Sequence, residues 1–187
     1  EMLRALRQAL DEIDDPPAIR WLTGARTMGA DALRAAGFDD VLVVHETAAV
    51  TSEADTERTT RACLERGAAI VVFCGGDGTA RDVYAAVGTD LPTLGIPAGV
   101  KIHSAVYATS PRSAGELAAL YLRGSISATR QAEVMDIDEA AYRRGVVSAR
   151  LYGYLTVPYR SSLVQGVKVA SRPGEAASMA AIAAEVA

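Results

Sequence analysis

The sequence contains few cysteines, few aromatic residues and no long apolar run, and each shortage excludes a class of protein. Its two cysteines, Cys63 and Cys74, form neither a disulfide framework nor a metal-binding spacing, and we expect Cys74 to be a small buried residue at a strand end. The 19 basic and 23 acidic residues leave a net charge of −4, which argues against nucleic-acid binding through dense Lys and Arg patches. No apolar run approaches the ~20 residues of a membrane span, and no signal peptide is recognisable. We therefore expect a cytosolic protein that binds neither nucleic acid nor membranes.

The composition and the local patterns favour an α/β fold. Aromatic residues make up 5% and hydrophobic residues 50% of the chain, with much alanine, which suits packed layers of helices and strands better than an all-β sandwich. Helical patterns alternate with four short strand candidates: Ile19–Leu22, Val41–Val44, Ala69–Phe73 and Thr93–Ile96. This alternation predicts βαβ units and a parallel sheet. We expect a Rossmann-like, three-layer α/β nucleotide-binding domain over residues 1–125.

Two local patterns predict the positions of individual helices. Ser52 is followed three residues later by Asp55, which resembles a capping box and predicts that a helix begins there. Apolar residues at Ile102, Ala105 and Val106 have helical spacing and predict a further helix.

The pattern changes at about residue 126, where strand periodicity replaces the alternation of strands and helices. Val146–Val157 alternates between two faces, and Leu163–Ala170 has the pattern of a further strand. Asp136 and Asp138 fall on one face of an earlier strand, and we interpret such alternating acids as solvent-facing. Strands that follow one another without helices predict antiparallel pairing. Residues 126–187 are therefore predicted to begin a second, β-rich domain.

The most informative stretch is the glycine loop Cys74–Thr79, which lies between a strand candidate and a helical pattern that starts at Ala80. Glycines can take φ > 0 and allow backbone N–H groups to approach an anion, and a helix N-terminus favours negative charge. Asp77, in the middle of the loop, would repel a phosphate placed directly on it. A carboxylate is useful there if the site takes a proton from a hydroxyl or holds a cation against phosphates. The loop is thus predicted to be the centre of a phosphoryl-transfer enzyme, with Asp77 as its catalytic residue.

Three other interpretations of this loop explain less. A dinucleotide-binding fingerprint requires a small residue at the position that Arg81 occupies. A P-loop requires its last glycine to be followed by Lys and then by Ser or Thr, whereas Gly78 is followed directly by Thr79. A tight strand-to-helix turn with Thr79 as N-cap accounts for one or two glycines, but not for three glycines around an acid. Phosphoryl transfer remains the favoured interpretation.

A second loop, Pro97–Lys101, follows the next strand candidate. Ligands on parallel sheets bind at the carboxyl ends of the strands, so the two loops can face one cleft. Lys101 stands at a helix start, where a cation opposes the helix dipole but suits a phosphate; a solvated lysine is an equally good reading of the residue alone. His103 is a lone histidine, and such residues more often pack or face solvent than act in catalysis. We assign it no role.

Three blocks of sequence carry a resemblance to a known family: Gly75–Val83, Leu94–Ser104 and Val134–Asp138. On these blocks the chain resembles the ATP-NAD kinase family, in its archaeal and actinobacterial branch. The first block alone is shared with the diacylglycerol and sphingosine kinases. The second block narrows the resemblance to this branch of the ATP-NAD kinase family. Members of the family are longer. Because this sequence begins at Glu1 and ends inside an alanine-rich pattern, we expect it to be part of a longer protein.

The resemblance implies a site and a reaction. It implies that Asp77 is the proton acceptor for the 2′-hydroxyl of the adenosine ribose of NAD, and that the nucleotide or its phosphates contact Gly75, Gly76, Gly78, Thr79 and Lys101. The donor would be ATP or polyphosphate, with Mg²⁺ bridging its phosphates as such phosphates usually require; the residues that hold the metal are unknown. Family members commonly form dimers or tetramers, so a homo-oligomer is expected. No equivalent is visible of the Asn-Glu pair that binds NAD in the better-known bacterial and animal NAD kinases.

Two further functions stay open at the level of sequence. One is a lipid or other small-alcohol kinase that shares the glycine loop. The other is a non-catalytic nucleotide-binding or regulatory module, although a mere binder gains nothing from the acid at Asp77.

Overall fold

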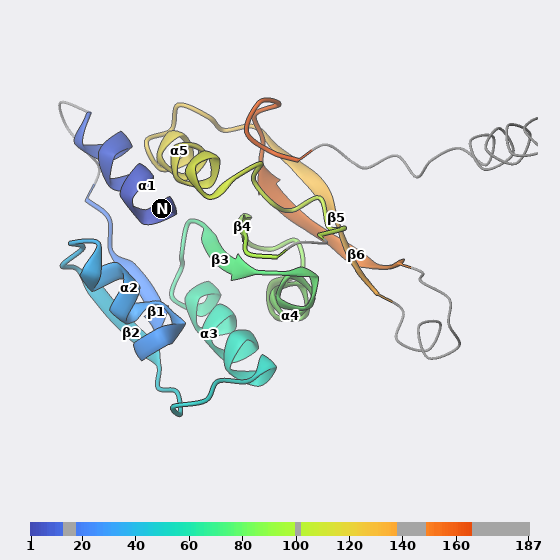
Figure 1. Ribbon diagram of the computed structural model, residues 1–187, viewed down its shortest axis with the longest axis horizontal. Helices are drawn as coiled ribbons and strands as arrows, with labels where there is room; N and C mark the ends of the chain where they lie inside the picture. Colours follow the sequence, from blue (N-terminus) through green and yellow to red (C-terminus); the bar gives the residue numbers. More distant parts are fainter. Residues whose placement is uncertain (13–17, 100–101, 138–148, 166–187) are drawn as a thin grey trace, which may run out of the picture.

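The computed structural model describes residues 1–12, 18–99, 102–137 and 149–165. Within these ranges, helices and strands alternate up to residue 122 and two long strands follow (Figure 1). In chain order the elements are α1 (Met2–Asp11), β1 (Trp21–Gly24), the 3-10 helix η1 (Arg26–Met28), α2 (Ala30–Ala35), β2 (Val41–His45), α3 (Glu53–Glu65), β3 (Val71–Gly75), α4 (Asp77–Val87), β4 (Thr93–Pro97), α5 (Pro111–Leu122), β5 (Thr129–Ile137) and β6 (Ala149–Pro158).

The strands pair as an α/β fold followed by an antiparallel unit. β1 pairs in parallel with β2, and β3 in parallel with β4, so the described parallel strands form two pairs. β5 and β6 pair antiparallel. Figure 1 shows β3 and β4 between a layer that contains α1 and α5 and a layer that contains α3 and α4. The predicted fold class is confirmed: a layered α/β region precedes antiparallel strands.

The start of α3 shows the predicted capping box. The Ser52 side chain accepts from the backbone of Asp55, and the Asp55 carboxylate accepts in return from the backbone N–H of Ser52 at 2.9 Å. His45, at the end of β2, contacts the same carboxylate through Nε2 at 2.9 Å. These contacts satisfy N–H groups that a helix start would otherwise leave without a partner. They also join the helix start to the end of a strand.

The helix predicted through Ile102, Ala105 and Val106 is wrong, because this segment is irregular in the structure. Its backbone bonds to two neighbouring strands instead of to itself: the Ala105 N–H donates to Glu133 of β5, and the Gly95 N–H of β4 donates to Val106. All three apolar side chains are buried. The apolar residues therefore reflect burial between two strands, which periodicity alone cannot distinguish from a helix.

The hydrophobic core is continuous from α1 to β6. Its largest fully buried apolar side chains come from both the α/β region and the antiparallel strands, and include Leu6, Leu94, Leu117, Val134, Leu155 and Val157. Tyr107 is fully buried in it, and its ring lies edge-on to that of Phe73 with ring centroids 5.6 Å apart. The division into domains at residues 125 and 126 stays a prediction.

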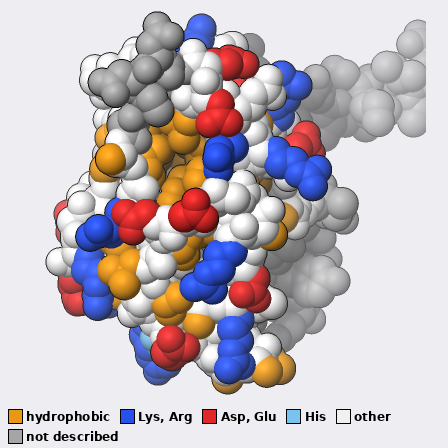
Figure 2. All heavy atoms as spheres, turned by 90° about the vertical axis from the view of Figure 1, so that its left-hand side faces the viewer, with side chains coloured by type: hydrophobic (Ala, Val, Ile, Leu, Met, Phe, Trp, Pro, Cys, Tyr) orange, Lys and Arg blue, Asp and Glu red, His pale blue; other side chains and the backbone are white. Residues whose placement is uncertain are grey.

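On the side of the molecule that carries α1 and the β1–β2 pair, hydrophobic side chains form a band between charged ones (Figure 2). Leu42 of β2 is 44% exposed. Within the described ranges, no helix combines the length and apolarity that crossing a bilayer requires. The cytosolic location stays a prediction.

Candidate active site

The glycine loop is tighter than the sequence suggests. β3 ends at Gly75, Gly76 is the N-cap, and α4 begins at Asp77 rather than at Ala80. The Ala80 N–H donates to the carbonyl of Gly76 at 3.1 Å, which closes the first helical turn. The reading in which Thr79 caps the helix is therefore wrong. Asp77 stands at the N-terminus of α4, where the helix dipole favours a negative charge.

The physical reason for a glycine differs among the three glycine positions of the loop. None has a positive φ, so the loop does not use the freedom of glycine to adopt that conformation. At Gly75, an added Cβ would lie 2.3 Å from Oγ1 of Thr79, so packing requires glycine. At Gly76 and Gly78 an added Cβ would meet nothing within 4 Å. Neither conformation nor packing explains these two glycines, whereas close approach of a ligand to the backbone would.

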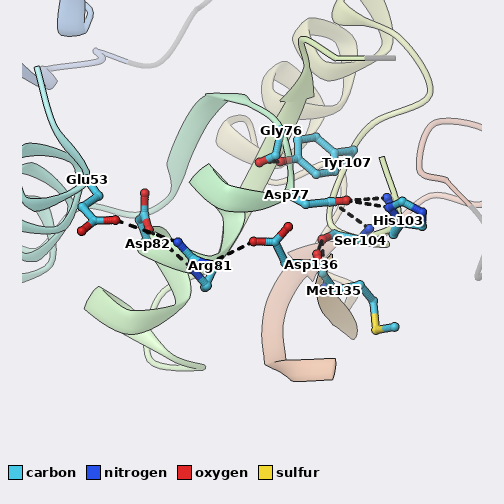
Figure 3. Close-up of polar contacts among 10 residues, drawn as sticks. All are labelled: Glu53, Gly76, Asp77, Arg81, Asp82, His103, Ser104, Tyr107, Met135 and Asp136. Atoms are coloured by element: carbon cyan, nitrogen blue, oxygen red, sulfur yellow. Dashed lines mark hydrogen bonds and ion pairs between the residues drawn. The ribbon is translucent and has the colours of Figure 1, made fainter. Parts of the chain in front are cut away.

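The carboxylate of Asp77 is buried and bound to the segment that follows β4 (Figure 3). Its Oδ2 accepts from the backbone N–H of His103 at 2.8 Å, and its Oδ1 accepts from that of Ser104 at 3.0 Å. The side chain of Asp77 is only 6% exposed. The structure thus brings together the two segments expected at the carboxyl ends of β3 and β4, with Asp77 as the link between them.

His103 lies against this carboxylate, with Nδ1 3.1 Å from Oδ2 of Asp77 (Figure 3). Its side chain is 36% exposed, so the imidazole is the accessible member of the pair. Sequence reasoning assigned it no role. In the sequence, His103 lies two residues after Lys101, in the segment that follows a strand candidate. This position alone is a weak indication of a role, and only the contact to Asp77 makes it informative.

Ser104 and Tyr107 hold the two halves of the site in place. The Ser104 hydroxyl donates to the carbonyl of Met135 at 2.8 Å and accepts from the Met135 N–H at 2.9 Å, which joins the segment to β5. The Tyr107 hydroxyl donates to the carbonyl of Gly76. Burial, and then the charge of Asp77, raise the pKa of Tyr107, so its hydroxyl stays a proton donor. The glycine loop is therefore supported from the core.

A second polar cluster surrounds Arg81, one helical turn after Asp77 (Figure 3). Arg81 contacts Asp136 of β5 at 3.2 Å, and lies 3.9 Å from Asp82 and from Glu53. Burial raises the pKa of Asp82, against the opposing effect of the Arg81 charge. The interpretation of Asp136 as simply solvent-facing is wrong, because its side chain is 20% exposed and paired with a cation. Asp138 lies outside the described residues.

Two further predicted positions have contrasting outcomes. Lys101 lies outside the described residues, and its phosphate role stays a prediction. Cys74 is exposed, not buried as expected, whereas Cys63 is buried. Burial raises the pKa of Cys63 to about 11. The ligand-binding and catalytic roles of Asp77, Gly75, Gly76, Gly78 and Thr79 stay predictions.

Comparison with known protein families identifies a match. The model of the ATP-NAD kinase N-terminal domain matches residues 4–126, which contain the glycine loop and the Asp77–His103 contact. No curated protein and no solved structure matches the chain. The match covers more than half of the chain, and its extent includes both segments that form the site. The chain therefore belongs to the ATP-NAD kinase family.

Proposed function

We propose that the protein transfers a phosphoryl group from ATP or polyphosphate to the 2′-hydroxyl of NAD, giving NADP. The observation that carries this proposal is the family match over residues 4–126. The geometry supports it, because an acid held at the carboxyl end of a parallel strand lies beside two glycines that conformation and packing leave unexplained. Membership of an archaeal or actinobacterial branch stays a prediction.

The backbone of Gly76 and Gly78 is the proposed contact for the donor or the nucleotide. Phosphoryl transfer passes through a loose transition state, so its catalysis is mostly positioning and stabilisation of charge. The N-terminus of α4 favours an anion there. The Asp77 carboxylate is turned toward His103 and Ser104, so a phosphate at the two glycines need not lie on it.

The proposal also gives the negative charge of Asp77 a role in the reaction. This charge would help to remove the proton of the acceptor hydroxyl as the new bond forms. The buried carboxylate accepts from two backbone N–H groups, which fix its position. Such fixed charges need no rearrangement at the moment of reaction, and this makes them effective in catalysis.

Mg²⁺ belongs to the proposal as an ion that enters with the phosphates of the donor. In the part of the chain that the structure describes, no group of three Asp, Glu, His or Cys side chains is arranged to hold a metal ion. Mg²⁺ commonly binds one or two carboxylates together with substrate phosphates. When bound, it would neutralise charge on the donor. Lys101 is a further proposed phosphate ligand.

The test is a direct assay of the full-length protein with NAD, Mg²⁺ and either ATP or polyphosphate. NADP is measured with an NADP-specific dehydrogenase. We expect NADP with at least one donor, and the compound that gives NADP is the phosphoryl donor. No NADP with either donor would contradict the proposal. Phosphorylation of diacylglycerol or another alcohol would then support the lipid or small-alcohol kinase, and NAD binding without turnover the regulatory module. Size-exclusion chromatography tests the proposed homo-oligomer.

A further inference from the structure

Two hydrogen bonds from other segments fix the backbone of the glycine loop. The carbonyl of Gly75 accepts from the backbone N–H of Ala98 at 3.2 Å. The carbonyl of Gly76 accepts from the hydroxyl of Tyr107. Glycine has more backbone freedom to lose than any other residue, and a Cβ added at Gly76 would meet nothing within 4 Å. The conformation at Gly76 therefore depends on its hydrogen bonds rather than on side-chain packing.

Tyr107 is itself fixed in the core. Its side chain is fully buried, and its ring lies edge-on to that of Phe73. A Cβ added at Gly95 of β4 would lie 2.5 Å from the Tyr107 ring, so the glycine at that position makes room for it. The residues before and after Tyr107 bond to this strand, because the Gly95 N–H donates to Val106 and the Gly95 carbonyl accepts from Ala108. The hydroxyl thus reaches the loop from a ring that is held on several sides.

The hydrogen bond of Tyr107 fixes the orientation of the peptide that joins Gly76 to Asp77. This peptide is trans, so its carbonyl and its N–H point in opposite directions. The carbonyl accepts from the Tyr107 hydroxyl and from the N–H of Ala80, which uses both of its lone pairs. The N–H, which belongs to Asp77, consequently points away from Tyr107. It is one of the N–H groups that the start of a helix leaves without a partner inside the helix.

The same peptide leads into the acid of the proposed reaction. Its plane contains the Cα of Asp77, so its orientation also sets the point from which the carboxylate extends. That carboxylate is bound in turn by the backbone N–H groups of His103 and Ser104. One peptide therefore joins an N–H group suited to a phosphate and the carboxylate that the proposal assigns to proton transfer.

We infer that the hydroxyl of Tyr107 is a positioning group for the proposed phosphoryl transfer. It orients the peptide between Gly76 and Asp77 so that the Asp77 N–H can donate to a phosphate group, either of the donor or of the diphosphate bridge of NAD. The inference rests on the proposed function, and Asp77 remains the proton acceptor in it. Because its side chain is fully buried, Tyr107 acts through the loop rather than on a substrate.

Tyr107→Phe in the full-length protein tests this role, because it removes one oxygen and keeps the ring. We expect KM to rise at least ~10-fold for the substrate whose phosphate contacts the loop, and to stay within about 3-fold for the other substrate. The midpoint of thermal unfolding should fall by no more than about 4 °C. A selective rise for ATP or polyphosphate assigns the phosphate to the donor, and a selective rise for NAD assigns it to the acceptor. Unchanged KM values, or equal rises for both substrates, would show that the hydroxyl is only structural and would overturn the inference.

Tyr84→Phe is the matched control. Tyr84 lies on the same helix as Asp77, but its ring packs against Gly153 of β6 instead of the glycine loop. Its kcat and KM should equal those of the wild type. A rise in KM as large as that in Tyr107→Phe would show that the loss of any tyrosine hydroxyl impairs the protein, and would overturn the assignment to Tyr107.

A binding measurement separates failure of this inference from failure of the proposed function. Inorganic tripolyphosphate and NAD are added separately, and the amide resonance of Asp77 is followed by ¹H–¹⁵N NMR in the wild type and in Tyr107→Phe. One of the two probes should shift this resonance in the wild type, with its Kd raised at least ~10-fold in the variant. No shift with either probe overturns the inference whatever the activity. A shift in a protein that forms no NADP overturns the proposed function, whereas the inferred contact of the Asp77 N–H with a phosphate stands.

Discussion

The Asp77 carboxylate, at the first residue of α4, accepts a hydrogen bond at 3.0 Å from the backbone N–H of Ser104, 27 residues further along the chain. This bond joins the segment after β4 to the end of β3. The acid is therefore part of the architecture as well as of the proposed chemistry. Changes at Asp77 should alter both stability and turnover, and the two effects can be measured separately.

Asp77→Asn should lower kcat by at least ~100-fold, because it removes the charge that the proposed proton transfer requires. It should also lower the free energy of unfolding by about 1–3 kcal/mol. The side-chain NH2 group of the asparagine would replace one carboxylate oxygen, and it cannot accept a hydrogen bond from the backbone N–H that faces it. Urea denaturation and NADP formation measure the two quantities. Wild-type turnover in a folded variant would remove Asp77 from the mechanism.

Alanine substitutions in the glycine loop should separate packing from ligand contact. Gly75→Ala places a Cβ 2.3 Å from Oγ1 of Thr79, so it should destabilise the fold by about 1–3 kcal/mol. Gly76→Ala and Gly78→Ala have open space and should change stability little, within about 1 kcal/mol. They should instead raise KM for NAD or for the donor, because the methyl group lies where a ligand would approach. Unchanged KM in both variants would show that neither glycine contacts a substrate.

The two cysteines should react very differently with a thiol reagent. Cys74 is exposed at the end of β3, whereas Cys63 is buried with its pKa raised to about 11, so it stays a protonated thiol at pH 8. One thiol should react in the native protein and both in denaturant, as measured by release of a chromogenic thiolate. Cys74→Ser should abolish the fast reaction. Protection by NAD or ATP would place a ligand near the glycine loop, and reaction of Cys63 at the same rate would contradict its burial.

The cap of α3 should make stability depend on pH in the acid range. The hydrogen bond with His45, followed by those with Ser52, lowers the pKa of Asp55 from 3.8 to about 2. Between these values the unfolded chain binds a proton that the folded chain does not, so stability rises with pH. The contribution is complete above about pH 4 and is lost as pH falls toward 2. Denaturation curves of wild type and Asp55→Asn across this range should converge at low pH; parallel curves would contradict the assignment.

The ion pair between Arg81 and Asp136 should couple α4 to β5. The two atoms lie 3.2 Å apart, and the side chains are 34% and 20% exposed, so solvent screens much of the attraction. A double-mutant cycle with Arg81→Gln and Asp136→Asn should give a coupling of about 0.5–1 kcal/mol that falls in high salt. Arg112 and Glu116, an exposed pair within α5, provide the matched control, with a smaller coupling. Equal couplings would show that the Arg81 pair has no special role.

Features that depend on near neighbours in the chain were predictable. The capping box needs only Ser52 and Asp55, three residues apart, and the strand–glycine–helix order of the loop is read along one stretch. The helix expected through Ala105 failed because its periodicity came from burial between β4 and β5. The start of α4 was misplaced because Gly76, rather than a side chain, caps the helix.

The order of residues along the chain by itself determined that an acid stands among glycines between a strand and a helix, because this arrangement is local. Only the tertiary structure decided what surrounds that acid. The parallel pairing of β3 with β4 brings His103 to Asp77 across 26 residues, and the core buries the carboxylate while leaving the imidazole partly exposed. No local pattern encodes this contact, since it arises from the pairing of strands and from the hydrogen bonds of Ser104 to Met135 and of Tyr107 to Gly76.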